Sequence, residues 1–393
     1  GSRNRLNPHR RPAGKHVRIS LRVSMQKSLD SLRRGTPGVV DPFHVPCPIH
    51  PLIPISKTML FYGAQSQLAQ RRENMEQIQI DQVIPAPDSW TPPQYQTTLA
   101  DSFEVNGPAT YKKGNHSTLV FEPMEEMEGW WISRSDQTEQ LPIRVFTGNV
   151  WNARRNIVLR SGSQHNYLRM TEHIIAHRLG LGVDNAVVTT GTGDPPLFDV
   201  GSIPIIEAIK RTGLKTLTDR PIVYRTVKEP VAILGPYGSF LEFSPEGAET
   251  RKLALDVAID FPTIIGKQRI VFDLTPETFS FGAQARTNCS RKQMFLAKTF
   301  GLLFADTRNL GYTRTNILVA GKTKYVNKPL PELILDGKPL EAVWHRACLD
   351  LIAALSLIDY GRLCGRITSY KSGHSLDCRL MNLIYINKLL TTV

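Results

Sequence analysis

From residue 96 onward, the spacing of apolar residues shows the same order of elements twice. Each time, segments with the alternation of β-strands are followed by segments with the period of α-helices. In the first cycle, alternating segments at 116–123 and 129–135 precede a helical segment at 170–180. In the second cycle, alternating segments between 221 and 261 precede helical segments at 341–358 and 376–390. A chain that groups its strands and helices in this way folds as α+β. We therefore expect two α+β domains of similar plan, at 96–218 and 219–393.

The first 95 residues have a different composition and form a basic, Pro-rich N-terminal extension. Residues 1–34 carry ten Lys and Arg and a single acid, Asp30. Dense prolines between 35 and 95 exclude long helices and central strands. We expect an extended arm with one helix near 64–83, lying along another surface. Arg-rich text with few acids is typical of organelle-targeting segments. It equally suits an arm that places its arginines against RNA phosphates, namely Arg3, Arg5, Arg10, Arg11, Arg18 and Arg22.

Composition narrows the class of protein further. The net charge of +13 and the pI near 9.6 favour polyanionic partners. Since no run of about 18 apolar residues occurs, we expect no membrane span. The five cysteines are scattered, with no CxxC pair. This pattern indicates a reducing compartment and argues against both a disulfide framework and a cysteine zinc knuckle.

Five motifs carry a resemblance to a known family. They are TEHIIAHRLGLGVDNAVV, DFPTIIGKQRIVFDLTPETF, ARTNC, CLDLIAAL and SYKSGHSLDCRLMNLI, in that order. Their order and spacing resemble UDP-3-O-acyl-N-acetylglucosamine deacetylase, the zinc amidase of lipid A biosynthesis, over roughly residues 100 to 390. The resemblance implies two α+β domains packed with their helices facing each other and a site between them. It also implies one zinc held by two histidines and an aspartate, with a glutamate as general base.

Most site positions of that family have matching residues here. Glu172 matches the general base and His173 the first zinc ligand. Asp350 matches the zinc aspartate, and His374 matches the late histidine that stabilises the oxyanion or protonates the leaving amine. Asp260 matches an acid that contacts substrate, although it could equally cap a turn.

One zinc ligand has no obvious match. The family's second zinc histidine lies four residues before the aspartate, and Arg346 stands at that position. His345 lies one residue earlier, and on an α-helix it would point about 100° away. We therefore expect the ligand to be lost, with the Arg346 guanidinium replacing the metal as counter-charge to Glu172 and Asp350.

A rival hypothesis restores the metal by another route. His177 lies one helical turn after His173, and HxxxH spacing suits zinc. A histidine on a helix is, however, more often a packing residue. Other positions also depart from the family pattern: Ala354 replaces an aspartate, Ala258 a threonine and Lys112 a histidine, and Val200 interrupts a turn between Asp199 and Gly201.

These departures replace residues on which the family's catalysis depends, whereas the residues that the fold needs are kept. We therefore predict a catalytically inactive deacetylase-like protein that needs no cofactor. It would be an architectural subunit of a large RNA–protein assembly in the mitochondrial matrix, by analogy the mitochondrial ribosome, with rRNA and neighbouring proteins as partners. The alternative is an active zinc-dependent deacetylase acting on a UDP-acylated glucosamine in a bacterial cytoplasm.

Overall fold

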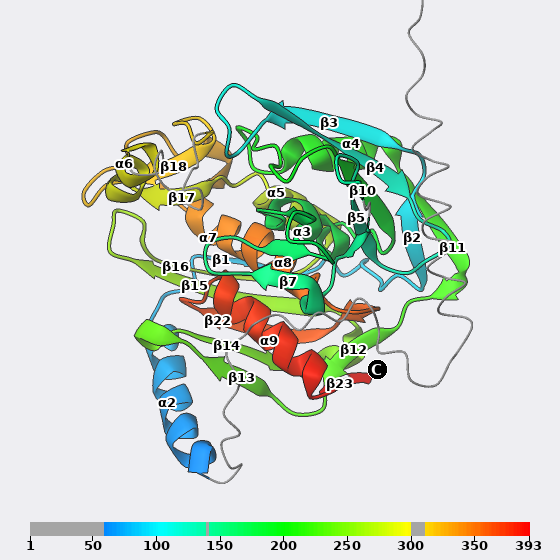
Figure 1. The fold of residues 1–393 in the computed structure, drawn as a ribbon. Coiled ribbons are helices and arrows are strands. Elements are labelled where there is room, and N and C mark those ends of the chain that lie inside the picture. Colours follow the sequence, from blue (N-terminus) through cyan, green and yellow to red (C-terminus); the bar gives the residue numbers. More distant parts are fainter. Residues whose placement is uncertain (1–58, 139–140, 300–310) are drawn as a thin grey trace, which may run out of the picture.

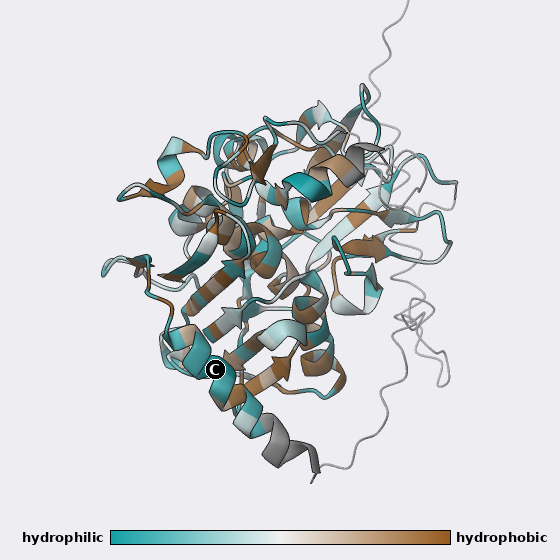
Figure 2. Ribbon diagram, turned by 90° about the vertical axis from the view of Figure 1, so that its left-hand side faces the viewer, coloured by the Kyte–Doolittle hydropathy of each residue, from teal (hydrophilic) through white to brown (hydrophobic). Residues whose placement is uncertain are grey.

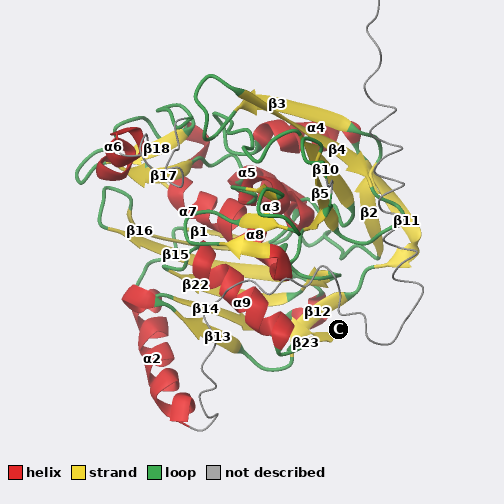
Figure 3. Ribbon diagram, viewed as in Figure 1, coloured by secondary structure: helices red, strands yellow, loops and turns green. Residues whose placement is uncertain are grey.

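The computed structural model describes residues 59–138, 141–299 and 311–393, and it shows a mixed α+β fold with several sheets (Figures 1 and 3). The predicted α+β class is confirmed. The division at residues 218 and 219 stays a prediction. Among the described residues, no helix has the length and apolarity that crossing a membrane requires.

A five-stranded sheet with the order β3-β4-β10-β5-β6 forms the upper part of Figure 1. The predicted strand at 116–123 is β4, in which buried residues alternate with less buried ones, as expected for a strand with one face on the core. All five residues of β10 are buried, and β10 lies in the middle of the sheet between β4 and β5. The strands are β3 (Phe103–Pro108), β4 (His116–Pro123), β5 (Trp130–Arg134), β6 (Ile143–Arg144) and β10 (Ala186–Thr190), with helix α4 (Ile203–Thr212) packed against β3.

A six-stranded sheet with the order β1-β16-β15-β22-β14-β13 forms the lower part of the same view. Its long central strand β15 pairs antiparallel with β16 and parallel with β22. Helix α9 (His374–Ile386) packs on β13 and β14. The strands are β1 (Gln82–Ile84), β13 (Val231–Leu234), β14 (Phe240–Ser244), β15 (Leu253–Phe261), β16 (Gly266–Asp273) and β22 (Gly365–Tyr370).

The helices that carry the site motifs lie between these two sheets (Figure 1). Helix α3 (Glu172–Gly180) packs against α8 (Ile352–Leu355) and against the residues just before it. Helices α5 (Pro276–Gly282) and α7 (Glu341–His345) adjoin them. Buried residues from both sheets and from these helices form one continuous core, visible as brown inner elements in Figure 2.

The helix predicted at 341–358 is interrupted. Between α7 and α8, residues Arg346–Leu351 form a π-helix, in which hydrogen bonds join residues i and i+5. The expectation of a regular α-helix through the motif is therefore wrong. This difference decides the geometry of the site.

The described part of the N-terminal extension lies along the second sheet of its own chain. Helix α2 (Met59–Glu76) accounts for the predicted helix, and β1 then joins β16 in parallel at the sheet edge. Residues 1–58, with the predicted RNA-contacting arginines Arg3, Arg5, Arg10, Arg11, Arg18 and Arg22, lie outside the described residues. RNA binding by this arm stays a prediction.

Smaller elements complete the fold. Residues Met170, Leu197, Met294, Ile317 and Val319 form a separate apolar cluster around β17, α6 and β18. The remaining elements are β2 (Tyr95–Leu99), β7 (Val150–Asn152), β8 (Val158–Arg160), β9 (Tyr167–Leu168), β11 (Leu214–Pro221), β12 (Tyr224–Val227), β17 (Thr287–Ser290), α6 (Arg291–Thr299), β18 (Ile317–Ala320), β19 (Ile334–Leu335), β20 (Lys338–Pro339), β21 (Arg362–Leu363) and β23 (Leu390–Thr392).

Candidate active site

The first turn of α3 presents Glu172 and His173 to the interior. Met170 takes a left-handed conformation, with φ of 49°, just before the helix begins. The Thr171 hydroxyl donates to the Ile157 carbonyl (3.0 Å), and the Ile157 N–H donates to Glu172 Oε2 (2.9 Å). These bonds fix the carboxylate in a site where its residue is only 2% exposed. Burial raises the pKa of Glu172 to about 7, although nearby His374 opposes the shift.

The π-helix brings His345 and Asp350 to the same face. On an α-helix, five positions rotate a side chain about 140° past a full turn. In a π-helix each turn takes more residues and the hydrogen bond runs between i and i+5, so these two positions lie on nearly the same face. His345 Nδ1 accordingly lies 3.6 Å from Asp350 Oδ1. The expectation that His345 points away from Asp350 is wrong, because the extra residue is absorbed by the π-helix.

His345 also meets His173 across the helix interface. Their ring centroids are 5.3 Å apart, and the rings are tilted. Burial, together with the adjacent His345, lowers the pKa of His173 to about 3. Burial likewise lowers the pKa of His345. Both imidazoles are therefore neutral near pH 7 and retain the lone pair that a metal ligand needs.

His374, the first residue of α9, lies close to both acids of the site, Glu172 and Asp350. Its Nε2 lies 3.7 Å from Glu172 Oε1 and 3.6 Å from Asp350 Oδ1. Burial raises the pKa of Asp350, but His374, His345 and Arg346 together outweigh burial and hold that pKa below its ordinary value. Asp350 is therefore a carboxylate. The predicted residues Glu172, His173, Asp350 and His374 thus come together.

Arg346 is engaged mainly elsewhere. Its Nη2 donates to both carboxylate oxygens of Asp377, each at 2.6 Å, and to the Ser372 hydroxyl at 2.7 Å. Its Nη1 is 3.8 Å from Asp350 Oδ2. The expected ion pair with Asp350 is thus present but long, and the chief partner is Asp377. Sequence reasoning missed Asp377, although its place on the first turn of α9, three residues after His374, was a usable signal.

The other candidate residues lie in different surroundings. The His177 Nδ1 pairs with the Ile174 carbonyl oxygen (2.8 Å), and its ring packs edge-on against Phe279. Burial lowers the pKa of His177 to about 4, so it is a neutral core residue. Asp260 forms an ion pair with Lys371 Nζ at 3.4 Å.

The substituted positions also have defined places. Ala354 is fully buried on α8. Ala258 packs with Met75 and Phe240 in the small cluster under α2, on the face of β15 opposite to Val257 and the main core. Lys112 is exposed. Asp199 accepts a hydrogen bond from the Thr315 hydroxyl.

The side chains of His173, His345 and Asp350 are donors of the kind that zinc takes, two imidazoles and one carboxylate. Five buried polar atoms around Asp350 have no hydrogen-bond partner among the described residues: His345 Nε2, Arg346 Nε and Nη1, Asp350 Oδ1 and His374 Nδ1. A tetrahedral zinc site with metal–ligand distances of about 2.0–2.1 Å has ligand atoms about 3.3–3.4 Å apart. The 3.6 Å separation of His345 Nδ1 and Asp350 Oδ1 is close to that value. Within the described ranges, no three His, Cys, Asp or Glu side chains converge tightly enough to hold an ion as they stand.

Comparison with known proteins identifies the family. The sequence model of the LpxC family, UDP-3-O-acyl N-acetylglycosamine deacetylase, matches residues 96–385 of the 393. The chain belongs to the LpxC family. The resemblance expected from the five motifs is thereby confirmed.

Curated relatives in the LpxC family carry the name UDP-3-O-acyl-N-acetylglucosamine deacetylase. The protein of Syntrophus aciditrophicus is 26% identical over 287 residues, which cover 73% of this chain and 85% of the relative. The protein of Neisseria gonorrhoeae is 27% identical over 301 residues, covering 74% and 89%. The protein of Brucella ovis is 27% identical over 292 residues, covering 72% and 92%. The family match begins at residue 96, after the described extension.

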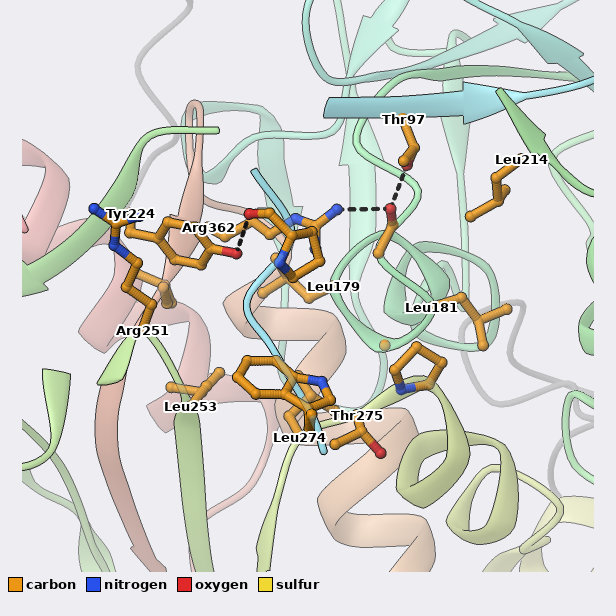
Figure 4. A pocket seen from close by; sticks show the side chains of 16 residues that line it. Thr97, Leu179, Leu181, Leu214, Tyr224, Arg251, Leu253, Leu274, Thr275 and Arg362 are labelled. Atoms are coloured by element: carbon orange, nitrogen blue, oxygen red, sulfur yellow. Dashed lines mark hydrogen bonds between the residues drawn. The ribbon is translucent and has the colours of Figure 1, made fainter. Parts of the chain in front are cut away.

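A separate pocket of about 240 Å³ lies at the C-terminal end of α3, the opposite end from Glu172 (Figure 4). Trp90 of the extension lines it together with Leu179 and Arg251. The Gly182 carbonyl accepts hydrogen bonds from Thr97 and Arg362 at its wall. The pocket is therefore distinct from the cluster around Asp350.

Proposed function

We propose that this protein is a zinc-dependent amidase that removes the acetyl group from a UDP-3-O-acyl-N-acetylglucosamine. The observation that carries the proposal is the approach of His345 to Asp350 across the π-helix, at 3.6 Å. The prediction of an inactive architectural subunit rested on the loss of this ligand together with the substitutions at Ala354, Ala258 and Lys112. Membership of the LpxC family and the geometry of His345 both favour the amidase alternative over that prediction.

His173, His345 and Asp350 are the residues that would hold the metal. Two neutral imidazoles and one carboxylate form a common catalytic zinc set that leaves a position open. Zinc, when bound, supplies a Lewis acid that lowers the pKa of water and polarises a carbonyl. This matches the charge of the site, because Asp350 is ionised and both histidines are neutral.

Glu172 and His374 divide the proton transfers. Glu172, whose pKa lies near 7 through burial, accepts a proton from the attacking water as the water oxygen bonds to the amide carbon. His374 lies 3.7 Å from Glu172 and is placed to protonate the amine nitrogen as the C–N bond breaks. The products are acetate and the free amine. The oxygen of the attacking water becomes part of the acetate, and a proton from that water balances the proton that the amine nitrogen gains.

The experiment is a turnover assay on the full chain supplied with zinc. UDP-3-O-acyl-N-acetylglucosamine is the substrate, and mass spectrometry follows the appearance of the free amine. We expect turnover by the wild type and at least a hundredfold loss in Glu172→Gln, since general-base catalysis contributes about 10²–10⁴-fold. The matched control is Glu125→Gln, which removes an exposed acid paired with Lys215. Zinc-loaded wild type without turnover, or equal rates in the two variants, contradicts the proposal.

A further inference from the structure

The described extension reaches the elements that hold the site, although it precedes the family match. Residues 59–95 lie before residue 96, where that match begins. They nevertheless make specific contacts with the second sheet and with α7. Two sets of contacts lead to different site histidines.

The first set runs through β1 to His345. β1 pairs in parallel with β16, with Gln82 opposite Ile270. The Gln82 Oε1 accepts a hydrogen bond of 3.0 Å from the indole N–H of Trp344. Trp344 is 1% exposed, and its ring lies 5.0 Å from Phe272 and 5.2 Å from Phe281. His345 is the next residue, so the Trp344 packing sets the direction of the helix where the π-helix begins.

Asp81 holds β1 in this register. Its N–H donates to the Arg269 carbonyl at 2.8 Å, and its Oδ2 accepts from the Arg269 N–H at 3.0 Å. Its Oδ1 pairs with Lys338 Nζ at 2.6 Å, just before α7. Asp81 is therefore bonded both to β16 and to the segment that precedes α7. These bonds fix the position of the next residue, Gln82, beside Trp344.

The second set runs through α2 toward His374. Met75 and Ile78 pack with Phe240, Ala258 and Tyr370 on the outer face of the sheet. Arg269 donates to the carbonyls of Met75 and Ile78 and makes two hydrogen bonds to Asp256, so that α2 ends against the sheet. Tyr370 ends β22, and the turn 371–373 then leads directly to His374. The apolar contact thus backs the strand end from which His374 projects.

We propose that residues 75–82 form a positioning element for the active site, in which Gln82 orients His345 through Trp344. Met75 and Ile78 support His374 through Tyr370. None of them touches the reacting atoms, so they are positioning residues. The inference rests on the proposed function for its catalytic meaning, but the contacts can be tested without turnover.

The test uses full-length Gln82 variants with two readouts. Gln82→Leu removes the acceptor and leaves a buried indole N–H unpaired, whereas Gln82→Glu keeps an acceptor. The matched control is Gln70→Leu, which changes an exposed glutamine of α2 whose side chain, among the described residues, bonds only Glu73. Hydrogen–deuterium exchange reports on residues 341–352, and chelator competition gives the zinc affinity.

We expect faster exchange across 341–352 in Gln82→Leu and zinc affinity weakened about tenfold, the lower range for loss of a partner behind a metal ligand. Gln82→Glu should restore both, and Gln70→Leu should match wild type. In a Trp344→Phe background, which already lacks the indole N–H, Gln82→Leu should add much less exchange than it does in wild type.

Equal exchange at 341–352 in Gln82→Leu and Gln70→Leu overturns the inference. If wild type binds no zinc, the proposed function fails, while the exchange comparison still decides whether Gln82 positions α7. Should Gln82→Leu not fold, Gln82→Asn, which shortens the acceptor side chain, takes its place. Exchange at 341–352 in Gln82→Asn that equals the wild-type rate would refute the role of Gln82.

Discussion

Loss of the Arg346 guanidinium should destabilise the fold through Asp377 much more than through Asp350. Arg346→Met leaves a carboxylate uncompensated in the interior, which costs about 3–5 kcal/mol for a buried pair. The Asp377 side chain is fully buried and that of Arg346 is 7% exposed, so water cannot replace the lost partner.

The two candidate partners differ in geometry enough to be separated. Arg346 Nη2 reaches both Asp377 oxygens at 2.6 Å, whereas Nη1 is 3.8 Å from Asp350 and makes no hydrogen bond to it. Hydrogen bonds to charged groups contribute about 1.5–3 kcal/mol each. We therefore expect a coupling energy of about 3 kcal/mol or more for Arg346 with Asp377, and about 1 kcal/mol for Arg346 with Asp350.

Two double-mutant cycles measure these energies. Arg346→Met is combined with Asp377→Leu in one cycle and with Asp350→Asn in the other, and urea denaturation gives the free energies of unfolding. A chelator is present so that metal loss does not contribute. A coupling energy larger with Asp350 than with Asp377 would refute the reasoning. It would mean that Arg346 chiefly neutralises Asp350, the carboxylate proposed to bind zinc.

Two further predictions concern α3. In metal-free chain, burial raises the pKa of Glu172 from 4.5 to about 7, so the folded state keeps a proton that the unfolded state releases. Unfolding free energy should therefore fall by about 3 kcal/mol relative to Glu172→Gln as pH rises from about 4.5 to above 7; a constant difference in urea denaturation across that range would contradict this. A Cβ at Gly180 would lie 2.3 Å from the Phe279 ring, whereas one at Gly191 has its nearest neighbour at 3.7 Å. Gly180→Ala should cost about 1–3 kcal/mol and Gly191→Ala much less, and equal melting temperatures would show that Phe279 moves freely.

The apolar pattern predicted the place of several elements, although α3 is buried on nearly all sides and not on one face alone. The strand at 116–123 and the helix starting near Glu172 occur where the apolar pattern places them. Glu172, His173, Asp350 and His374 could be named from their motifs. Their convergence followed from the resemblance to the LpxC family.

The role of His345 could not be predicted by counting residues on an α-helix. One extra residue between histidine and aspartate turns the two apart on an α-helix and together on a π-helix. Which helix forms depends on packing against α3 and α5, which local sequence does not encode. Arg346 was assigned to the wrong principal partner for a similar reason, since Asp377 lies 31 residues away in the chain.

The extension was only partly predictable. Its helix was expected near 64–83, and α2 covers Met59–Glu76. The dense prolines indicated that the extension is extended, but they did not indicate which surface it lies along. The course along the second sheet depends on an open edge at β16 and on single side chains such as Asp81 and Gln82.

Zinc binding by His345 and Arg346 variants tests the central claim most directly. Metal analysis of purified wild type should find about one zinc per chain, as expected for a catalytic site. Arg346→Lys, which keeps a cation beside Asp377, should retain the zinc, and His345→Ala should lose it. Zinc bound equally by His345→Ala and wild type would contradict the claim that the π-helix makes His345 a ligand.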